Sequence, residues 1–113
     1  MEIICETKKD IEIVKVKGRL DATNAADFEK DLITIIERNP KALVIDMEGL
    51  DYISSAGLRT LLLGAKLLKN KDRILALCGL RETVKEVFDI AGFTELFPIY
   101  ESEEEGLKEI ASS

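Results

Sequence analysis

Apolar residues along this chain fall into blocks with two different spacings. Short apolar runs of strand type occupy residues 2–7, 11–17, 42–47, 74–78 and 97–100. Between these runs, apolar residues recur at steps of three and four, the spacing of one face of an α-helix. Strands that alternate with helices pair mostly in parallel, because a parallel pair needs a long crossover connection. The pattern therefore predicts an α/β domain with a mostly parallel mixed β-sheet of about five strands.

The first two strands are the expected exception to parallel pairing. Only Lys8-Lys9-Asp10 separates them, which is too short for a helical crossover, so we expect an N-terminal antiparallel hairpin. The second strand, residues 11–17, alternates apolar with charged residues. We therefore expect one of its faces to be wet and the hairpin to lie toward a sheet edge. The runs at 42–47 and 74–78 are almost continuously apolar, as in strands covered on both faces.

Four helices are expected, each with start and stop signals. The first begins after Thr23 or Asn24 as a cap, carries an apolar stripe from Phe28 to Ile36, and ends at Asn39-Pro40. The other three are expected at residues 55–69, at residues 82–91 before Gly92, and from a Ser102–Glu105 capping box to about Ala111.

Length and charge narrow the classes of function. A chain of 113 residues with 46% hydrophobic residues can build one core, so we expect a single domain over residues 1–113. Its 22 acidic and 16 basic residues give a net charge of −6, which argues against direct binding of DNA or RNA. No apolar stretch approaches the roughly 18 to 20 residues of a membrane span, and residues 1–10 are too charged for a signal peptide. We expect a cytoplasmic protein without membrane contact.

Residues that usually carry catalysis or bind metals are scarce. The sequence contains no histidine, which excludes a Ser-His-Asp triad and most zinc sites. It also lacks a phosphate loop of the Gly-x-x-x-x-Gly-Lys type. Cys5 and Cys78 lie in or beside apolar runs without metal-type spacing, so we expect reduced core thiols. We expect no enzyme activity, no metal and no cofactor.

Two adjacent serines stand at the start of the second helix. The segment Asp51-Tyr52-Ile53-Ser54 follows a buried strand, and helical spacing begins at Ser55. A helix N-terminus offers unpaired N–H groups and the positive end of the helix dipole, which favour an anion or an attached phosphate. Ser54 or Ser55 is therefore a candidate site for a phosphate switch. The alternative is that one serine merely caps the helix.

Three aspartates follow strand-like runs, and Asp21, Asp46 and Asp51 could share a sheet edge with these serines. Clustered carboxylates could bind Mg²⁺, as in a receiver domain with an aspartyl phosphoacceptor. That alternative needs an acidic pair after the first strand, where this chain has Thr7-Lys8-Lys9. We expect instead that Asp21 and Asp51 accept hydrogen bonds from backbone N–H groups in turns and caps.

Four pieces of sequence, in order, carry a resemblance to a known family. They are Gly18-Arg19-Leu20-Asp21, Val44-Ile45-Asp46, residues 50–58, and a tail with Cys78-Gly79-Leu80, Val87-Phe88, Gly92-Phe93 and Leu96-Phe97. Over essentially its whole length, the chain resembles the anti-sigma factor antagonists of the STAS family. The resemblance implies a STAS-like single domain with about four α-helices.

The resemblance also implies a switch. The family pattern Asp-Ser-Ser/Thr-Gly falls on Ser54-Ser55-Ala56-Gly57, which makes Ser55 the expected phosphoacceptor and Ser54 the alternative. Ser54 stands where an aspartate is usual and Ala56 where a second hydroxyl is usual, so binding without phosphorylation stays open. The unmodified protein is expected to bind an anti-sigma factor that is also a serine kinase, and so to release a sigma factor. Phosphorylation ends the complex, and a serine phosphatase restores it.

The expected partner-binding surface surrounds the phosphoacceptor and extends along the second helix. Beside Arg59 and Lys66, this helix carries Leu63 and Leu67 outside its core stripe. Either these leucines contact the partner or a neighbouring helix covers them. Arg59 pairs either with a partner carboxylate or with a nearby acid such as Asp51. The full expected set is Asp21, Asp51, Ile53, Ser54, Gly57, Arg59, Leu63 and Lys66.

A phosphate at this position is expected to act on the interface and to leave the fold intact. It adds roughly −1.5 to −2 charges, which the N–H groups of a helix start tolerate. Gly57 is expected to allow close backbone approach, either by a partner or in local packing. The competing function is a STAS scaffold or regulatory module of a larger assembly, whereas a free antagonist is expected to be a monomer.

Overall fold

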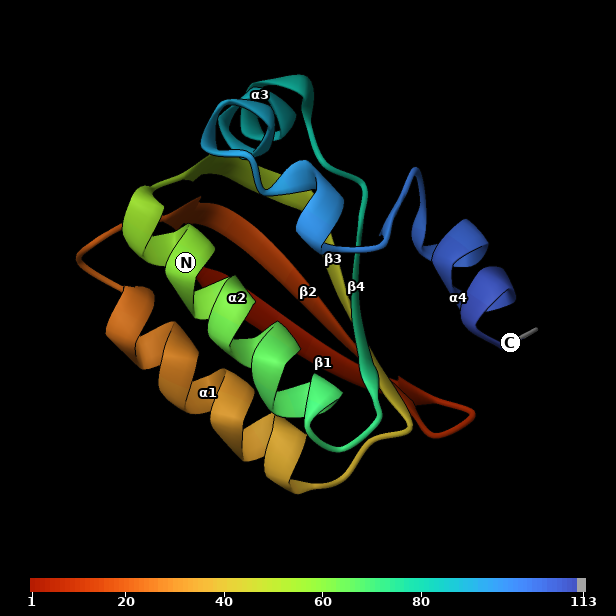
Figure 1. Cartoon of the computed structure of the whole chain (residues 1–113). Coiled ribbons are helices and arrows are strands. Elements are labelled where there is room, and N and C mark those ends of the chain that lie inside the picture. The colour runs from red at the N-terminus through yellow and green to blue at the C-terminus, as the bar shows by residue number, and fades with distance from the viewer. Residues whose placement is uncertain (112–113) are drawn as a thin grey trace.

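Five strands and four α-helices alternate along residues 1–111, the part of the chain that the computed structural model describes (Figure 1). The last two positions of the predicted domain, 112 and 113, lie outside the described residues. The strands are β1 Glu2–Lys8, β2 Ile11–Leu20, β3 Ala42–Ile53, β4 Ile74–Cys78 and β5 Ile99–Tyr100. The helices are α1 Ala25–Glu37, α2 Ser55–Lys69, α3 Glu82–Ala91 and α4 Glu103–Ala111, with a short 3-10 helix at Thr94–Leu96.

One sheet contains these strands in the order β1-β2-β3-β4-β5. β1 and β2 are antiparallel, and the other neighbouring pairs are parallel. Lys9 and Asp10 form the hairpin turn with φ angles of 51° and 68°, and a two-residue type I′ turn requires a positive φ at both positions. The predicted α/β class, the mixed sheet and the N-terminal hairpin are thus confirmed.

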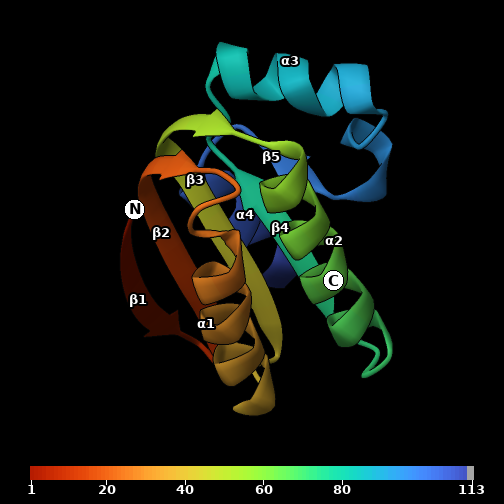
Figure 2. The same cartoon turned by 90° about the vertical axis from the view of Figure 1, so that its left-hand side faces the viewer.

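Helices cover both faces of the sheet. α1 and α2 lie side by side against one face, α4 lies against the other, and α3 crosses one end (Figure 2). The main core, between the sheet and α1, α2 and α3, includes Phe28, Leu61 and Phe88. A smaller core beneath α4 includes Cys78 and Ile110. Within residues 1–111, no helix has the length and apolar character that a membrane span needs.

Both faces of β2 are buried over residues 11–14, so the predicted wet face is wrong for the first half of the strand and holds only for its second half, where Lys17 and Arg19 are exposed. Residues 11–14 are all buried, and even Glu12 is only 7% exposed. The reason is that β2 is an interior strand between β1 and β3, so that of the hairpin only β1 lies at the sheet edge. The carboxylate of Glu12 accepts a 2.8 Å hydrogen bond from the Thr7 hydroxyl and lies 3.8 Å from Nη1 of Arg38.

β3 is longer, and β5 shorter, than the sequence predicts. The polar residues after Met47 suggest a loop, but β3 continues to Ile53 because β2 continues beside it, with Leu20 opposite Ile53. Gly49 fits this pairing, since a Cβ there would lie only 2.9 Å from the carbonyl oxygen of Val16. The longer strand leaves a single residue between β3 and α2. Residues 94–96 form a 3-10 turn, and β5 begins only at residue 99.

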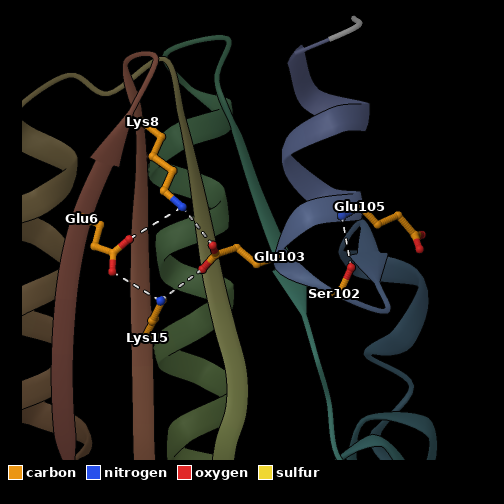
Figure 3. A network of polar contacts seen from close by, with 6 residues as sticks. All are labelled: Glu6, Lys8, Lys15, Ser102, Glu103 and Glu105. Atoms are coloured by element: carbon orange, nitrogen blue, oxygen red, sulfur yellow. Dashed lines mark hydrogen bonds and ion pairs between the residues drawn. The ribbon is translucent and has the colours of Figure 1, made fainter.

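Charged side chains attach α4 to the N-terminal hairpin (Figure 3). Glu103, in the first turn of α4, pairs with Lys8 at 3.4 Å and with Lys15 at 3.8 Å. Glu6 on β1 completes the network, at 3.8 Å from Lys8 and 3.3 Å from Lys15. The hydrogen bond to Glu6, followed by the charge of Glu103, raises the pKa of Lys15. The acidic first turn of α4 therefore helps to dock the helix, in addition to its favourable interaction with the positive end of the helix dipole.

Caps and thiols complete the comparison with the predicted fold. The hydroxyl oxygen of Ser102 accepts a 3.1 Å hydrogen bond from the N–H of Glu105, as the capping box predicts, and Gly92 ends α3 with a φ of 75°. Cys78 is buried beneath α4, and this burial is the main cause that raises the pKa of its thiol to about 12. Cys5 is exposed, so its predicted core position is wrong, because β1 is an edge strand with a neighbour, β2, on one side only.

Candidate functional site

Ser54 joins the central strand β3 directly to α2. Its backbone is extended, with φ −98° and ψ 174°, and its N–H donates to the carbonyl oxygen of Leu20 at 2.9 Å. Its hydroxyl oxygen accepts a hydrogen bond from the N–H of Gly57 at 3.3 Å, which caps the helix. The capping alternative therefore holds for Ser54, which is half-buried.

Ser55 is the first residue of α2 and is exposed. Its hydroxyl makes no hydrogen bond to any residue in the described range 1–111. The free N–H groups of the first turn and the positive end of the helix dipole lie beside it. The two neighbouring serines thus differ: Ser54 is committed to the cap, and Ser55 presents an unbonded hydroxyl at the surface.

Gly57 and Ile53 hold the start of α2 against the sheet. Gly57 is buried, and a Cβ at this position would lie 2.8 Å from Cγ of Leu20 and 2.9 Å from Cγ1 of Ile53. The close approach that the glycine permits is therefore to the chain's own strands. Ile53 is 1% exposed. Because both residues are buried beneath Ser55, neither can contact a partner in this conformation, and the prediction of direct contact is corrected to one of support.

The exposed side of α2 carries three of the predicted site residues in one line. Ser55, Arg59 and Lys66 are all exposed, and we call them the outer stripe. At the helical repeat of 3.6 residues per turn, they lie within about 40° of one another around the helix axis. Within residues 1–111, neither Arg59 nor Lys66 forms an ion pair. The outer stripe therefore presents one hydroxyl and two unpaired positive charges.

The two leucines beside the outer stripe differ in their surroundings. Leu67 is half-buried and packs against the main core. Leu63 is half-buried at the margin of α2. α1 comes close on that side of the helix, since a Cβ on Gly64 would lie 3.5 Å from Cδ1 of Leu32. Of the two predicted alternatives, cover by the protein itself holds for Leu67, and Leu63 keeps part of its surface exposed.

An ion pair that the sequence did not indicate closes one side of the site. Nη1 of Arg81 lies 2.5 Å from Oδ1 of Asp51, and its Nε donates to the carbonyl oxygen of Glu48 at 2.7 Å. Asp51 lies within β3, and Arg81 directly precedes α3. The predicted pairing of Asp51 with Arg59, and its predicted cap, are therefore wrong. The available signal was the place of Arg81 just after a parallel strand, where loops meet at one sheet edge.

Asp21 forms the turn that the sequence predicts. Its Oδ1 accepts hydrogen bonds from the hydroxyl of Thr23 at 2.5 Å and from the N–H of Thr23 at 3.0 Å. These bonds, the hydroxyl bond first, lower the pKa of the Asp21 carboxyl. Asn24 occupies the N-cap position of α1, but its side chain turns back, accepting from the N–H of Asp21 at 3.0 Å and donating to the carbonyl oxygen of Arg19 at 2.8 Å. Side-chain hydrogen bonds therefore fix the loop that follows β2.

Arg19 and Tyr52 form a second contact that the sequence did not indicate. They lie opposite each other in the register of β2 and β3, and the guanidinium carbon of Arg19 lies 4.2 Å from the centre of the Tyr52 ring. A cation over an aromatic face is attracted by the ring quadrupole. Nε of Arg19 also lies 3.9 Å from Oδ2 of Asp21. Arg19 is therefore engaged on two sides.

Asp46 does not share this edge of the sheet. From Asp46, β3 continues to Ile53, which at about 3.3 Å per residue is roughly 20 Å. Its Oδ1 accepts a 3.0 Å hydrogen bond from the N–H of Glu48. The described residues contain no group of three or more Cys, Asp or Glu side chains that could hold a metal ion. The carboxylate cluster of the receiver alternative is therefore not formed by Asp21, Asp46 and Asp51.

Comparison with known proteins gives a family and close relatives. The family model described as STAS domain matches residues 2–106. The chain is 41% identical over 92 residues to the candidate anti-sigma factor antagonist BtrV of Bordetella bronchiseptica, which covers 81% of this chain and 79% of that protein. It is 26% identical over 111 residues to the anti-sigma F factor antagonist of Paenibacillus polymyxa, which covers 97% of this chain and 95% of that protein.

Solved structures share the fold. A candidate anti-sigma factor antagonist of Thermotoga maritima superposes with a TM-score of 0.91 at 18% identity, covering 96% of this chain and 94% of that chain. The phosphorylated form of the Bacillus cell fate determinant SpoIIAA superposes with a TM-score of 0.73 at 19% identity, covering 96% of this chain and 99% of that chain. At these identities the likeness concerns the fold alone.

Proposed function

The chain belongs to the STAS domain family, and on this premise we propose that it is an anti-sigma factor antagonist controlled by phosphorylation of Ser55. Its curated relatives carry that functional name, BtrV as a candidate. The observation that supports the choice of residue is the exposed, unbonded hydroxyl of Ser55 at the first position of α2. In this proposal the unmodified protein binds an anti-sigma factor, and the phosphorylated protein does not.

The partner in this proposal is an anti-sigma factor that is also a serine kinase. Binding it releases a sigma factor for transcription, and a serine phosphatase later removes the phosphate and restores binding. DNA and RNA are not direct partners, in keeping with a net charge of −6. The free antagonist is proposed to be a cytoplasmic monomer that has no catalytic step of its own.

Ser55 is a better acceptor than Ser54 on physical grounds. The Ser54 hydroxyl caps α2 through Gly57, and loss of such a cap costs about 1 kcal/mol. The Ser55 hydroxyl has no bond within residues 1–111 to lose. A phosphate on Ser55 would meet the N–H groups of the first turn and the positive end of the helix dipole. Modification at Ser55 therefore leaves the cap in place.

The proposed docking surface is the outer stripe of α2, with Leu63 beside it and Ser54 at its start. Arg59 and Lys66 give this stripe a positive charge on a chain whose net charge is negative. Complementary charge across an interface steers association and disfavours wrong partners, so a partner surface with carboxylates is expected.

Other predicted site residues take supporting positions in this proposal. Asp21 and Asp51 form the rim at the sheet edge, the first held by Thr23 and the second by Arg81. Ile53 and Gly57 lie beneath the acceptor and fix its height above the sheet. Their contribution to binding is therefore indirect, through the position of Ser55.

A phosphate on Ser55 acts on the interface rather than on the fold. It adds roughly −1.5 to −2 charges at neutral pH, which the helix start accommodates. Against a partner surface with carboxylates, the same charge is repelled and loses its hydration. A penalty on the order of 3 to 5 kcal/mol would weaken binding by hundreds- to thousands-fold.

Titration of a cognate anti-sigma kinase with matched variants tests the proposal. Ser55→Ala is expected to bind with the affinity of the unmodified protein and to gain no phosphate by intact mass. Ser55→Asp is expected to lose at least tenfold in affinity, with an unchanged circular dichroism spectrum. Ser54→Ala, the control, should still be phosphorylated.

Three results would contradict the proposal: phosphate on Ser55→Ala, full affinity of Ser55→Asp, or unfolding of Ser55→Asp. Light scattering of the free protein addresses the competing scaffold function, because an assembly of many copies would favour the scaffold over the free antagonist.

A further inference from the structure

Three arginines stand near the end of the sheet that carries Ser55, and two of them are already engaged. Arg81 pairs with Asp51 and donates to a backbone carbonyl. Arg19 lies over the ring of Tyr52 and beside a carboxylate. Arg59 is exposed and, among the described residues 1–111, has no hydrogen bond or ion pair. It is therefore the arginine that is free to bind a new anion.

Arg59 is one helical turn beyond Ser55 on the same face of α2. Residues four apart on a helix have Cβ atoms about 6 Å from each other and can pair. Helical side chains also lean toward the N-terminus, so the longer side chain of Arg59 extends back in the direction of Ser55. The spacing and the lean together place a guanidinium within reach of a group attached to the Ser55 oxygen.

We propose that Arg59 binds the phosphate on Ser55, so that phosphorylation removes from the outer stripe the cation that the unmodified protein offers to a partner carboxylate. A guanidinium suits this role, because its planar fork of N–H groups can donate two parallel hydrogen bonds to phosphate oxygens. The switch then has two parts: it adds negative charge at the head of the stripe, and it occupies Arg59. This inference rests on the proposed function, since it requires a phosphate on Ser55.

The surrounding charges leave this pairing without a strong competitor. Asp51 already holds Arg81, and the carboxylate of Asp21 is bonded to Thr23. Lys66, the other cation of the outer stripe, is eleven residues from Ser55, which is about 16 Å along the helix axis. Arg59 is therefore the cation of the stripe that can contact the phosphate directly.

The test uses the full chain made with phosphoserine at position 55 by genetic encoding, so that no kinase is needed. The pKa of the second phosphate ionisation is measured by ³¹P NMR. Arg59→Gln is expected to raise this pKa by about 0.3 unit or more, because a paired cation stabilises the dianion. The phosphate pKa of Arg59→Lys should fall between those of the phosphorylated parent and Arg59→Gln, since lysine keeps the positive charge but lacks the paired N–H groups of the guanidinium. Lys66→Gln is the matched control on the same face and should leave the pKa within about 0.1 unit.

A second readout reports on Arg59 itself. Its Nε–H resonance should shift when the phosphorylated and unmodified chains are compared, and the shift should follow the phosphate titration. Equal phosphate pKa values in the phosphorylated parent and Arg59→Gln would overturn the proposal. Equal shifts from Arg59→Gln and Lys66→Gln would do the same, because they would indicate a general field rather than a pair.

This experiment fails separately from the proposed function. The phosphate is installed without a kinase, and its pKa is measured without a partner. If a cognate partner is released by phosphorylation but Arg59→Gln leaves the pKa unchanged, the pairing is wrong and the switch stands. If the pKa moves as expected but phosphorylation leaves the partner bound, the pairing stands as a contact and the proposed switch is wrong.

Discussion

Gly57 lies so close to Leu20 that a Cβ added to the glycine would be 2.8 Å from Cγ of the leucine. The contact joins the first turn of α2 to the end of β2, and Ile53 at the end of β3 lies almost as near. The end of β2, which is distant in the sequence, thus meets the junction of β3 and α2 beneath Ser55. The position of the proposed phosphoacceptor is set by the core and not by a free loop.

Substitution of Gly57 by alanine should destabilise the protein. Alanine gains about 1 kcal/mol of helix propensity over glycine, but the methyl group must be forced against Leu20 and Ile53, and overpacking typically costs about 1 to 3 kcal/mol. We expect a net loss of up to about 2 kcal/mol in the free energy of unfolding by urea. Lys69→Ala on the exposed side of α2 is the control and should change it by less than about 0.5 kcal/mol. A more stable Gly57→Ala would contradict the close contact.

The two serines should separate in a stability measurement. Ser54→Ala removes the side-chain cap of α2 and should lower the free energy of unfolding by about 1 kcal/mol. Ser55→Ala breaks no bond within residues 1–111 and should change it by less than about 0.5 kcal/mol. Thermal or urea unfolding of both variants checks this. A larger loss for Ser55→Ala than for Ser54→Ala would mean that the assignment of cap and free hydroxyl is reversed.

Removal of the Glu103 charge should loosen α4. Glu103→Gln loses its ion pairs with Lys8 and Lys15, and an exposed pair is worth about 0.2 to 1 kcal/mol. Cys78, beneath α4, reports the opening, since its thiol pKa of about 12 keeps it unreactive near pH 8 while it is covered. In a Cys5→Ser background, labelling of Cys78 by a thiol reagent should accelerate by about 2- to 10-fold.

Salt and a neighbouring carboxylate provide the controls for that measurement. High salt screens the ion pairs and should accelerate labelling of the parent protein more than that of Glu103→Gln. Glu104→Gln, in the same turn, should leave the rate unchanged, because Glu104 is exposed and has no ion pair within residues 1–111. Equal labelling rates for all three proteins at low salt would show that the ion pairs do not hold the helix.

Asp21 should contribute to stability in a pH-dependent way. The bonds from Thr23 favour the ionised carboxyl and lower its pKa from the usual 3.8. A group whose pKa is lowered by folding stabilises the protein above its unfolded pKa, and this contribution is lost as the pH falls through the folded value. The difference in unfolding free energy between the parent and Asp21→Asn should therefore be largest at neutral pH and shrink below pH 3.8.

The sequence predicts the order of strands and helices well because that information is local. The bounds of α2 and α3 follow from apolar spacing, from a serine pair at one helix start and from Gly92 at the other helix end. The burial of Glu12 and the length of β3 could not be predicted in this way. Both depend on which strands lie beside β2. Strand pairing is a tertiary property, and the polar residues at these positions gave no indication of it.

The candidate site also combines features that local sequence predicts with features that depend on tertiary structure. The serine pair and the turn at Asp21 are visible in the sequence, because a helix start and an Asx turn are made by residues close together in the chain. The pairing of Asp51 with Arg81 joins residues 30 positions apart, so spacing gave no sign of it. That pairing also occupies Asp51, the acid with which Arg59 was expected to pair if it did not bind a partner carboxylate. Within residues 1–111, Arg59 therefore has no acidic partner.

A junction of one residue gives α2 no slack. Ser54 is bonded to Leu20 on one side and to the helix on the other, so a tilt of the helix would displace the ends of β2 and β3. A partner that binds α2 therefore also restrains the strands to which the start of the helix is attached. Its capture should slow amide hydrogen exchange along β2 and β3, well away from any contact, and its departure should let both strands relax together.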